Sequence, residues 1–151
     1  MDIRTAERAD WERVLNDARP PTFLQSWAWG EAQRSLGEDV IRMMVTDGKD
    51  ILGGAQAVTV TARRAQFLHV PHGPVIRSQQ DDRRKTEAAA ALLRALRDEA
   101  ERRHLHFLRV SPIQENTANS RRFYRALGFR SAPIHLHAER LWILDLAPTE
   151  E

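Results

Sequence analysis

The 151-residue sequence contains no cysteine. That absence excludes a disulfide framework, a thiol nucleophile and a thiolate metal site. The sequence also lacks a long apolar run, and its charged start, MDIRTAERADWERVL, has no apolar segment of the kind that a signal peptide carries. Because no segment is apolar over the length of a membrane span, we expect a cytoplasmic location.

Lysine is scarce, since only Lys49 and Lys85 accompany the arginines among the 23 basic residues. A guanidinium pairs bidentately with carboxylate or phosphate, but a GC-rich genome, whose codons favour arginine, is the simpler explanation. The net charge of +2 is weak evidence for a polyanionic partner. The length and the 42% apolar fraction predict one folded domain over residues 1–151.

The first half of the sequence predicts two helices and a three-stranded meander. The helices are expected over 10–17 and 26–37, and the strands over 40–46, 51–61 and 65–70. Ser26 is suited to begin the second helix and Gly37 to end it. Gly53 and Gly54 lie inside the second strand, which predicts a bulge or the close approach of another segment.

The second half predicts a crossover helix between parallel strands. A helix over 82–103 has an apolar stripe made of Ala89, Leu92, Leu93, Leu96 and Ala100. A strand over 105–110 follows it at once, which favours a parallel connection. A helix over 117–127 and strands over 129–132 and 141–146 complete the prediction. This order predicts an α/β (α+β) fold, a mixed central sheet with helices on both faces.

The stretch N-T-A-N-S-R-R-F-Y-R-A-L-G-F, from Asn116 to Phe129, resembles the last helix of GNAT proteins, the fold of acyl-CoA-dependent N-acetyltransferases. The resemblance implies a GNAT-like sheet for the whole chain. We expect the helix to face that sheet through Phe123, Ala126 and Leu127, with Phe129 filling the core.

Three further segments resemble the first half of Fem-type (FemAB) peptidoglycan aminoacyltransferases. They are FLQSWAWG at 23–30, GGA at 53–55 with VPHGPV at 70–75, and LWILDL at 141–146. The family transfers an amino acid from aminoacyl-tRNA to an amine on a UDP- or lipid-linked muropeptide, a peptidoglycan precursor, and uses no further cofactor. Its members carry two GNAT-like domains, so the resemblance implies a second domain or a partner chain.

The resemblance also implies substrate-binding residues. In the family a basic residue in the helix after W-G contacts the phosphate of the muropeptide carrier; Gln33 stands at that position here and Arg34 is adjacent. His72 replaces the arginine that the family usually has before Gly73. The expected substrate-binding residues are Arg34, His72 and Gly73, to which we add Arg77 and Tyr124, the latter because a place beside a buried Phe123 would put its hydroxyl at the rim of a cleft. Exposed surface positions are the alternative. No catalytic residue is predicted.

The loop over 71–82 disfavours acetyl-CoA. Acetyl-CoA-dependent GNAT enzymes bind pyrophosphate on the backbone N–H groups of a glycine-rich loop at a helix N-terminus. This loop has one glycine and two prolines, and it ends in Asp81 and Asp82, whose charges repel phosphate. Two alternatives stay open: a stand-alone N-acetyltransferase that uses acetyl-CoA, and a non-catalytic GNAT-like scaffold.

Three polar groups have simpler interpretations than a site. His104/His106 and His135/His137 would share a strand face and suit a metal, but no acid or cysteine completes a ligand set, so no metal is predicted. The run Arg83-Arg84-Lys85 begins the long helix, where we expect it to be solvated; contact with tRNA phosphate is the alternative.

Overall fold

The computed structural model describes residues 1–133 and 136. The elements follow in the order β1 (Asp2–Thr5), α1 (Arg8–Asn16), the 3-10 helix η1 (Phe23–Gln25), α2 (Trp27–Ser35), β2 (Val40–Asp47), β3 (Asp50–Ala62), β4 (Ala65–Pro71), β5 (Val75–Ile76), α3 (Asp82–Arg102), β6 (Phe107–Ser111) and α4 (Ala118–Ala126). The predicted helices and the first four predicted strands are present, whereas β1, η1 and β5 are additional. The strand predicted over 129–132 is wrong, because those residues have no regular structure. The one predicted over 141–146 lies outside the described residues.

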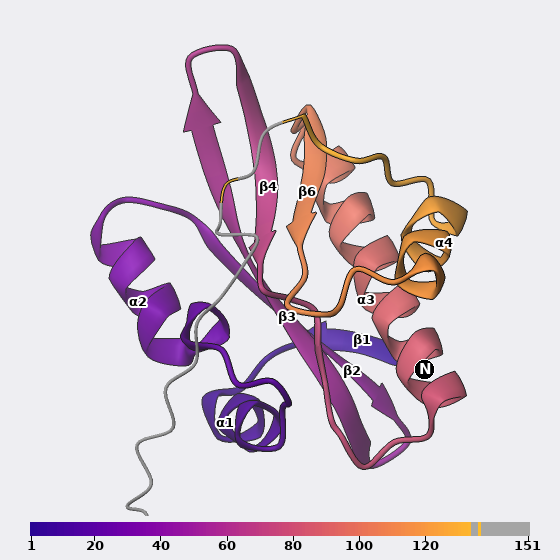
Figure 1. Cartoon of the computed structure of the whole chain (residues 1–151). Helices are drawn as coiled ribbons and strands as arrows, with labels where there is room; N and C mark the ends of the chain where they lie inside the picture. The colour runs from indigo at the N-terminus through magenta and orange to yellow at the C-terminus, as the bar shows by residue number, and fades with distance from the viewer. Residues whose placement is uncertain (134–135, 137–151) are drawn as a thin grey trace, which may run out of the picture.

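The sheet is mixed, as predicted (Figure 1). Its strands lie in the order β1-β2-β3-β4-β6, and β5 pairs separately with β3. The meander β2-β3-β4 is antiparallel. The crossover through α3 then brings β6 parallel to β4, in a register that runs from Phe67 opposite Phe107 to Pro71 opposite Ser111. The carboxyl ends of these two parallel strands therefore meet.

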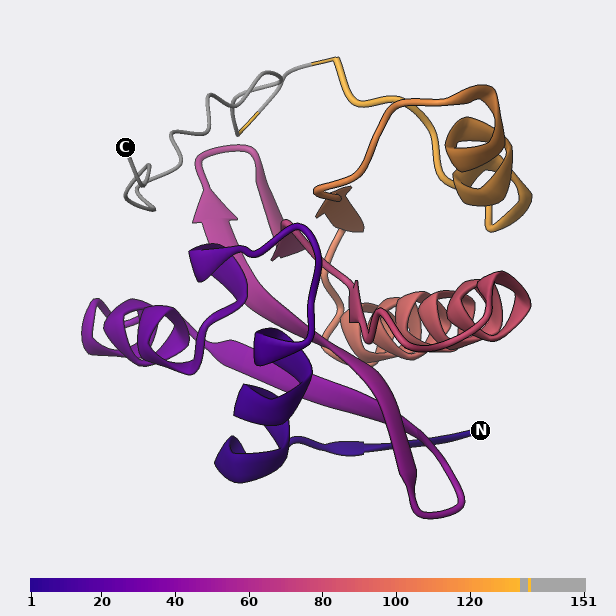
Figure 2. The same ribbon diagram turned by 60° about the horizontal axis from the view of Figure 1, so that its bottom comes forward.

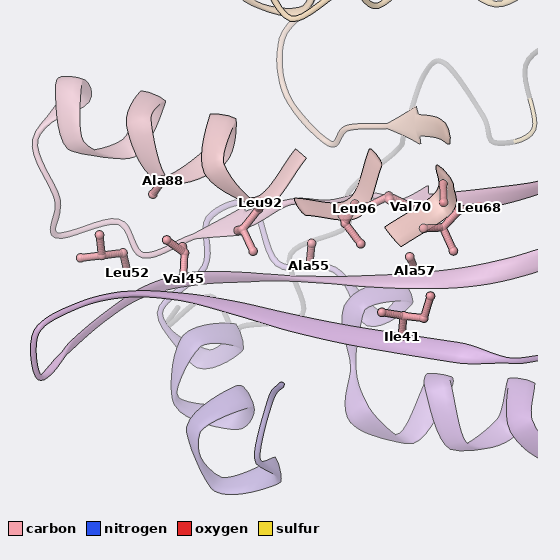
Figure 3. Packing of buried hydrophobic residues seen from close by; sticks show 11 residues of the cluster. Ile41, Val45, Leu52, Ala55, Ala57, Leu68, Val70, Ala88, Leu92 and Leu96 are labelled. Atoms are coloured by element: carbon pink, nitrogen blue, oxygen red, sulfur yellow. The ribbon is translucent and has the colours of Figure 1, made fainter. Parts of the chain in front are cut away.

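Helix α3 covers one face of the sheet (Figure 3). Its buried side chains Ala88, Leu92, Leu96 and Ala100 pack against strand residues that include Ile41, Val45, Leu68 and Val70. The predicted stripe is shifted at its start, because Ala88 is buried and Ala89 only half-buried. Since side chains alternate along a strand, the burial of Leu68 and Val70 under α3 turns His69 to the opposite face.

Helices α1 and α2 lie on that opposite face, which confirms helices on both faces (Figure 2). Trp11 of α1 is 2% exposed, and its indole N–H donates to the Gln25 carbonyl at 2.7 Å. Gly54 permits this packing, because a Cβ there would lie 2.7 Å from the Trp11 ring. The predicted close approach at the two glycines of β3 is confirmed.

Helix α4 does not face the sheet as predicted. It has no buried residue: Ala126 is exposed, while Phe123, Leu127 and the following Phe129 are half-buried. Figures 1 and 2 place it to the side of β6 and α3, away from α1 and α2. The aromatic side chains pack locally, with the Tyr124 ring edge-to-face against Phe123 and Phe129.

Local hydrogen bonds explain why α4 is helical without buried residues. The Thr117 hydroxyl accepts from the Ser120 N–H at 3.1 Å, and the Ser120 hydroxyl accepts from the Thr117 N–H at 2.9 Å, a capping box. Gly128 follows the helix with a φ of +86°, a conformation that suits glycine. Within the described part of the chain, no helix has the length and apolar character to cross a membrane.

Candidate functional site

Strand β4 separates from β3 where the chain approaches its carboxyl end. His69 is still paired with Val58, and the next pair on this side of β3 joins Val75 of β5 to Gly54. The side chain of Gln25 fills the interval. Its Oε1 accepts from the Gln56 N–H at 2.8 Å, and its Nε2 donates to the Gln56 carbonyl at 3.0 Å. The amide of Gln25 thus pairs with β3 in place of a strand.

Gln25 also fixes the loop that leaves β4. Its Nε2 donates to the Pro71 carbonyl at 2.5 Å, and the residue is fully buried. A Cβ on Gly73 would lie 2.9 Å from the Gln25 amide and 2.9 Å from the Val70 side chain. Glycine is therefore required at position 73 by packing.

His72 lies between these residues in an uncommon conformation. Its φ is +53°, in the left-handed region that few residues other than glycine occupy. Its N–H donates to the Ser111 carbonyl of β6 at 2.8 Å, and its Nδ1 lies 2.9 Å from the Thr22 hydroxyl. The backbone of His72 is thus hydrogen-bonded to β6, and its imidazole contacts Thr22 in the segment before α2.

A second histidine completes the group. His69 is 7% exposed, and its Nε2 lies 3.3 Å from the Ser111 hydroxyl. We name Thr22, Gln25, His69, His72 and Ser111 the β4–β6 cluster. It occupies the carboxyl ends of parallel strands, where α/β sheets commonly bind ligands. Imidazole accepts a proton near neutral pH, so the cluster contains groups suited to proton transfer.

Arg34 of α2 lies elsewhere, at the edge of the sheet beside β2. Its guanidinium donates to the Glu31 carboxylate at 3.0 Å and to the Val40 carbonyl at 3.0 Å. It lines a hollow of ≈ 520 Å³ together with Trp27, Arg42, Arg102 and other residues of α2, β2 and α3. The lining contains the guanidinium groups of Arg34, Arg42, Arg102 and Arg103 and one carboxylate, that of Glu99, so its excess positive charge suits an anionic ligand.

Of the three arginines in this hollow that sequence analysis missed, Arg42, Arg102 and Arg103, the side chain of Arg42 is only 3% exposed. Its Nη1 lies 2.9 Å from the Glu31 carboxylate, its Nε donates to Gln56 at 2.7 Å, and its guanidinium lies 3.9 Å above the Trp27 ring. A Cβ on Gly30 would overlap the side chains of Arg42 and Gln56.

Charges in this network perturb each other. Burial lowers the pKa of Arg42, while its hydrogen bond to Glu31 opposes that effect. The same hydrogen bond, more than the nearby charge of Arg34, lowers the pKa of Glu31. The ion pair between Glu31 of α2 and Arg42 of β2 thus joins the helix to the strand.

Arg77 follows β5, close to α1. Its Nε donates to the Asp17 carboxylate at 2.9 Å, and its N–H donates to the Leu52 carbonyl at 2.9 Å. It lines a second hollow of ≈ 360 Å³ with Arg13, Ile51 and other residues. Arg77 accordingly joins β5 to α1 and lies in a different hollow from Arg34.

Tyr124 lies on α4, between the rings of Phe123 and Phe129. The neighbouring groups exclude water from its phenol and raise the pKa of Tyr124. This residue therefore belongs to an aromatic group next to β6.

The structure thus brings together only part of the predicted set. His72 and Gly73 join the β4–β6 cluster, whereas Arg34, Arg77 and Tyr124 lie in three other places. Thr22, Gln25, His69 and Ser111 were missed. The sequence did contain a signal for His69 and Ser111. Both lie near the carboxyl ends of two strands that were predicted to be parallel, and ligands commonly bind at such ends. Nothing in the spacing of residues 22 and 25 indicated contact with residues 71–73.

The expected strand pair of His104 and His106 is wrong. His104 follows α3 with a φ of +56°, and the Leu105 N–H donates to the Ala100 carbonyl at 2.9 Å. His104 thus occupies the helix-ending position where glycine is usual. No cluster of three metal-ligating side chains occurs among the described residues, and His135 and His137 lie outside them.

The start of α3 is surrounded by carboxylates. Asp81 caps the helix by accepting from the Arg84 N–H at 2.8 Å, and Asp82 lies in the first turn. Arg84 also pairs with Asp47 at 2.6 Å and lies 3.6 Å from Asp50. The N–H group that Asp81 engages is one of those on which a helix N-terminus binds an anion.

Solved structures share this fold. FemX superposes with a TM-score of 0.74 at 19% identity over 86% of this chain, and this chain spans 32% of the FemX chain. A probable acetyltransferase has a TM-score of 0.64 at 16% identity, with 96% of this chain and 99% of that chain covered. Glucosamine-6-phosphate N-acetyltransferase from Arabidopsis thaliana has a TM-score of 0.62 at 15% identity, covering 91% of this chain and 96% of its own.

These likenesses define the class: the chain has a GNAT-like fold, a mixed α/β sheet shared with acyltransferases. No protein-family model matches the sequence, and no curated protein matches it. At identities this low, the superpositions establish the fold but do not identify the acyl donor.

Proposed function

We propose that the chain is an aminoacyltransferase domain of the Fem type. In this proposal it binds a peptidoglycan precursor and acts with aminoacyl-tRNA as the donor, together with a second GNAT-like domain or a partner chain. Because aminoacyl-tRNA is made in the cytoplasm, the proposal includes a cytoplasmic location for the protein. The observation that carries the proposal is the arrangement of acids at the start of α3.

Those acids disfavour a coenzyme A donor. A pyrophosphate at the start of α3 would meet the negative charges of Asp81 and Asp82. Asp47 and Asp50 lie there too, and Arg84 neutralises their charges only in part. The Asp81 side chain already accepts the N–H of Arg84. Like charge and an occupied N–H group both oppose phosphate binding. An aminoacyl ester needs no such cradle, because its activating group is the RNA.

The chemistry requires little from the protein. The amine nitrogen attacks the ester carbonyl carbon, the new C–N bond forms, and the bond from that carbon to the ribose oxygen breaks. The amine loses a proton and the ribose oxygen gains one. We assign the proton-accepting role to an imidazole of the β4–β6 cluster, with His72 as the half-buried candidate held by Thr22 and Ser111.

The hollow beside Arg34 is the proposed place of the anionic carrier. Arg34 and Arg102 are 46% and 68% exposed there, whereas Arg42 lies behind them with 3% exposure. Exposed guanidinium groups bind diphosphate bidentately, and the buried one adds positive potential. Gln33, at the position where the family has lysine, leaves Arg34 to supply this charge.

Titration calorimetry with the purified chain tests the proposal. We expect saturable binding of a UDP-linked muropeptide, weakened by Arg34→Gln and unchanged by the matched variant Arg94→Gln, which removes an exposed charge from α3. Transfer of a radiolabelled amino acid from aminoacyl-tRNA is expected once the second domain is supplied. Absence of binding to both the muropeptide and the tRNA would exclude the proposed function.

A stand-alone acetyltransferase is the second candidate. It is favoured by solved acetyltransferases that this chain matches over nearly the full length of both chains. It requires saturable binding of acetyl-CoA, and a thermal shift with acetyl-CoA but not with the muropeptide would establish it in place of the Fem-type proposal. If no ligand shifts the unfolding temperature, the third alternative, a non-catalytic scaffold, is left; the exposed Phe23 and Leu36 would then be candidates for its contact surface.

A further inference from the structure

The segment Asn116–Pro133, which contains α4, differs from the rest of the chain in charge. It has four arginines and no acidic residue, whereas the remainder has 19 basic and 21 acidic residues, a net charge of +4 against −2. The four are Arg121, Arg122, Arg125 and Arg130. A genomic preference for arginine codons explains why these residues are not lysine, but it does not explain the absence of acids.

Most arginines elsewhere in the described structure pair with an acid, whereas these four do not. In the run at the start of α3, Arg83 pairs with Glu87 at 2.8 Å and Arg84 with Asp47 at 2.6 Å. Among the described residues, Arg121 bonds only to Asn116, through the carbonyl and side-chain oxygens, both at 2.9 Å. Over residues 1–133 and 136, no ion pair joins the four arginines of Asn116–Pro133 to an acid. Their positive charges are therefore not neutralised within the described structure.

The geometry of α4 suits an extended anion. Arg121 and Arg122 lie one helical turn before Arg125, so the three side chains share one side of the helix, and all are exposed. They are spaced along the surface and do not converge on a small pocket. Phosphates repeated along a nucleic-acid backbone fit this spacing better than a single diphosphate does.

A membrane surface fits α4 less well. Helices that lie on membranes combine a basic face with an exposed apolar face. The large apolar side chains that are exposed in the described residues are Met1, Ile3, Phe23, Leu36, Phe107 and Leu136. None of them belongs to α4, where Phe123 packs against Tyr124.

We propose that the arginine face of Asn116–Pro133 docks the phosphate backbone of the RNA that carries the aminoacyl group. The inference rests on the proposed function and extends it by naming the surface that holds the donor. The segment Pro112–Asn116 connects Ser111 of the β4–β6 cluster to the Thr117 cap of α4 (Figure 1). An RNA bound along α4 would thus lie beside the segment that leads from the cluster to the helix.

Fluorescence anisotropy with a labelled RNA hairpin that has a single-stranded 3′ end tests this docking. The test variant of the full chain is Arg122→Gln/Arg125→Gln/Arg130→Gln; Arg121 is kept because it bonds to Asn116. The control Arg63→Gln/Arg64→Gln/Arg94→Gln removes the same charge from exposed arginines outside this segment that also lack an ion pair in the described structure. We expect the test variant to bind on the order of 100-fold more weakly at about 0.1 M salt, with the slope of log K against log salt reduced by about 2 to 3. The control should stay near the wild-type value.

Equal weakening by the two variants would overturn the proposal, because charge alone would then explain binding. It would also be overturned if the test variant lost binding to vesicles of phosphatidylglycerol and phosphatidylcholine and kept its RNA affinity. The corresponding triple lysine variant should retain most of the affinity, which guards against a folding defect. RNA binding that does not depend on α4 contradicts this inference alone. Failure of the wild-type chain to bind RNA also contradicts this inference, and it contradicts the proposed function if the chain does not bind the UDP-linked muropeptide either.

Discussion

The side-chain amide of Gln25 pairs with the backbone of Gln56 as a neighbouring strand would, with an acceptor bond of 2.8 Å and a donor bond of 3.0 Å. Both residues are fully buried. A 3-10 helix far away in sequence thereby completes the sheet at the point where β4 turns away. The interaction explains how the chain forms a loop at the carboxyl end of β4 without leaving the backbone of β3 unpaired.

The variant Gln25→Leu should be strongly destabilised. It removes three hydrogen bonds and leaves the Gln56 N–H and the carbonyls of Gln56 and Pro71 buried without this partner. We expect a loss of roughly 3 kcal/mol or more in the free energy of unfolding, measured in urea. The exposed Gln79→Leu is the control; a similar loss in both variants would show that Gln25 has no special role.

Gly30→Ala should destabilise the protein although alanine favours helices. Helix propensity alone predicts a gain of about 1 kcal/mol. The added Cβ would overlap Arg42 and Gln56, whose positions are fixed by the ion pair with Glu31 and by the hydrogen bonds to Trp27 and Ser26. The sign of the change in unfolding free energy decides between the two effects, and a gain in stability would contradict the close packing.

His104→Gly should stabilise the protein. A residue with a side chain pays roughly 1 kcal/mol in the left-handed conformation, and His104 has a φ of +56° at the end of α3. The melting temperature should therefore rise by a few degrees. The greater conformational freedom of glycine in the unfolded chain makes this rise smaller than the relief of strain alone would give. His106→Gly is the comparison, since no left-handed conformation is relieved there. An unchanged or lower melting temperature for His104→Gly would exclude this explanation.

Acid should weaken the end of α3 through Glu99. Its hydrogen bond from Arg102, followed by that from Arg103, lowers the pKa of Glu99 below its ordinary 4.5. A lowered folded-state pKa contributes stability that is present above 4.5 and is lost as the pH falls through the folded value. Glu99→Gln should therefore be less stable than wild type at pH 7, with a difference that shrinks below pH 4.5.

The matched variant for that experiment is Glu101→Gln, which removes the same charge from the same helix at a site that is 72% exposed. It should lie closer to wild type at pH 7, because the pairs of Glu99 with Arg102 and Arg103 remain. Urea unfolding over a series of pH values provides the curves. If Glu99→Gln and Glu101→Gln gave the same pH dependence, the assignment to Glu99 would be wrong.

Much of the fold could be predicted because it depends on local patterns. The apolar stripe of α3, the Ser26 cap, the Gly37 ending and the alternation in β3 are each written within a few consecutive residues. The parallel pairing of β4 and β6 follows from a strand, a helix and a strand in succession. The brief strands β1 and β5 were missed because four and two residues carry too little pattern.

The site was only partly predictable because its members come from separate segments. Gly73 and His72 were found through the loop motif, but their partners Gln25, Thr22 and Ser111 lie 39 to 50 residues away in sequence. The prediction for α4 was wrong for a related reason: apolar residues at helical spacing indicate a helix, but they do not determine which surface covers them. Among the described residues, Phe123 and Phe129 pack against Tyr124 and neither belongs to the core between α3 and the sheet.

The sequence by itself determined the class of fold, the positions of the helices to within about two residues at each end and the charge asymmetry of Asn116–Pro133, since each depends on the type and order of neighbouring residues. Only the tertiary structure decided that His69 and Ser111 meet and that Gln25 replaces a strand beside Gln56. It also decided that Arg34 and Arg77 line separate hollows. The physical reason is that a contact across the sheet depends on register and on the path of the intervening chain, which no local pattern encodes.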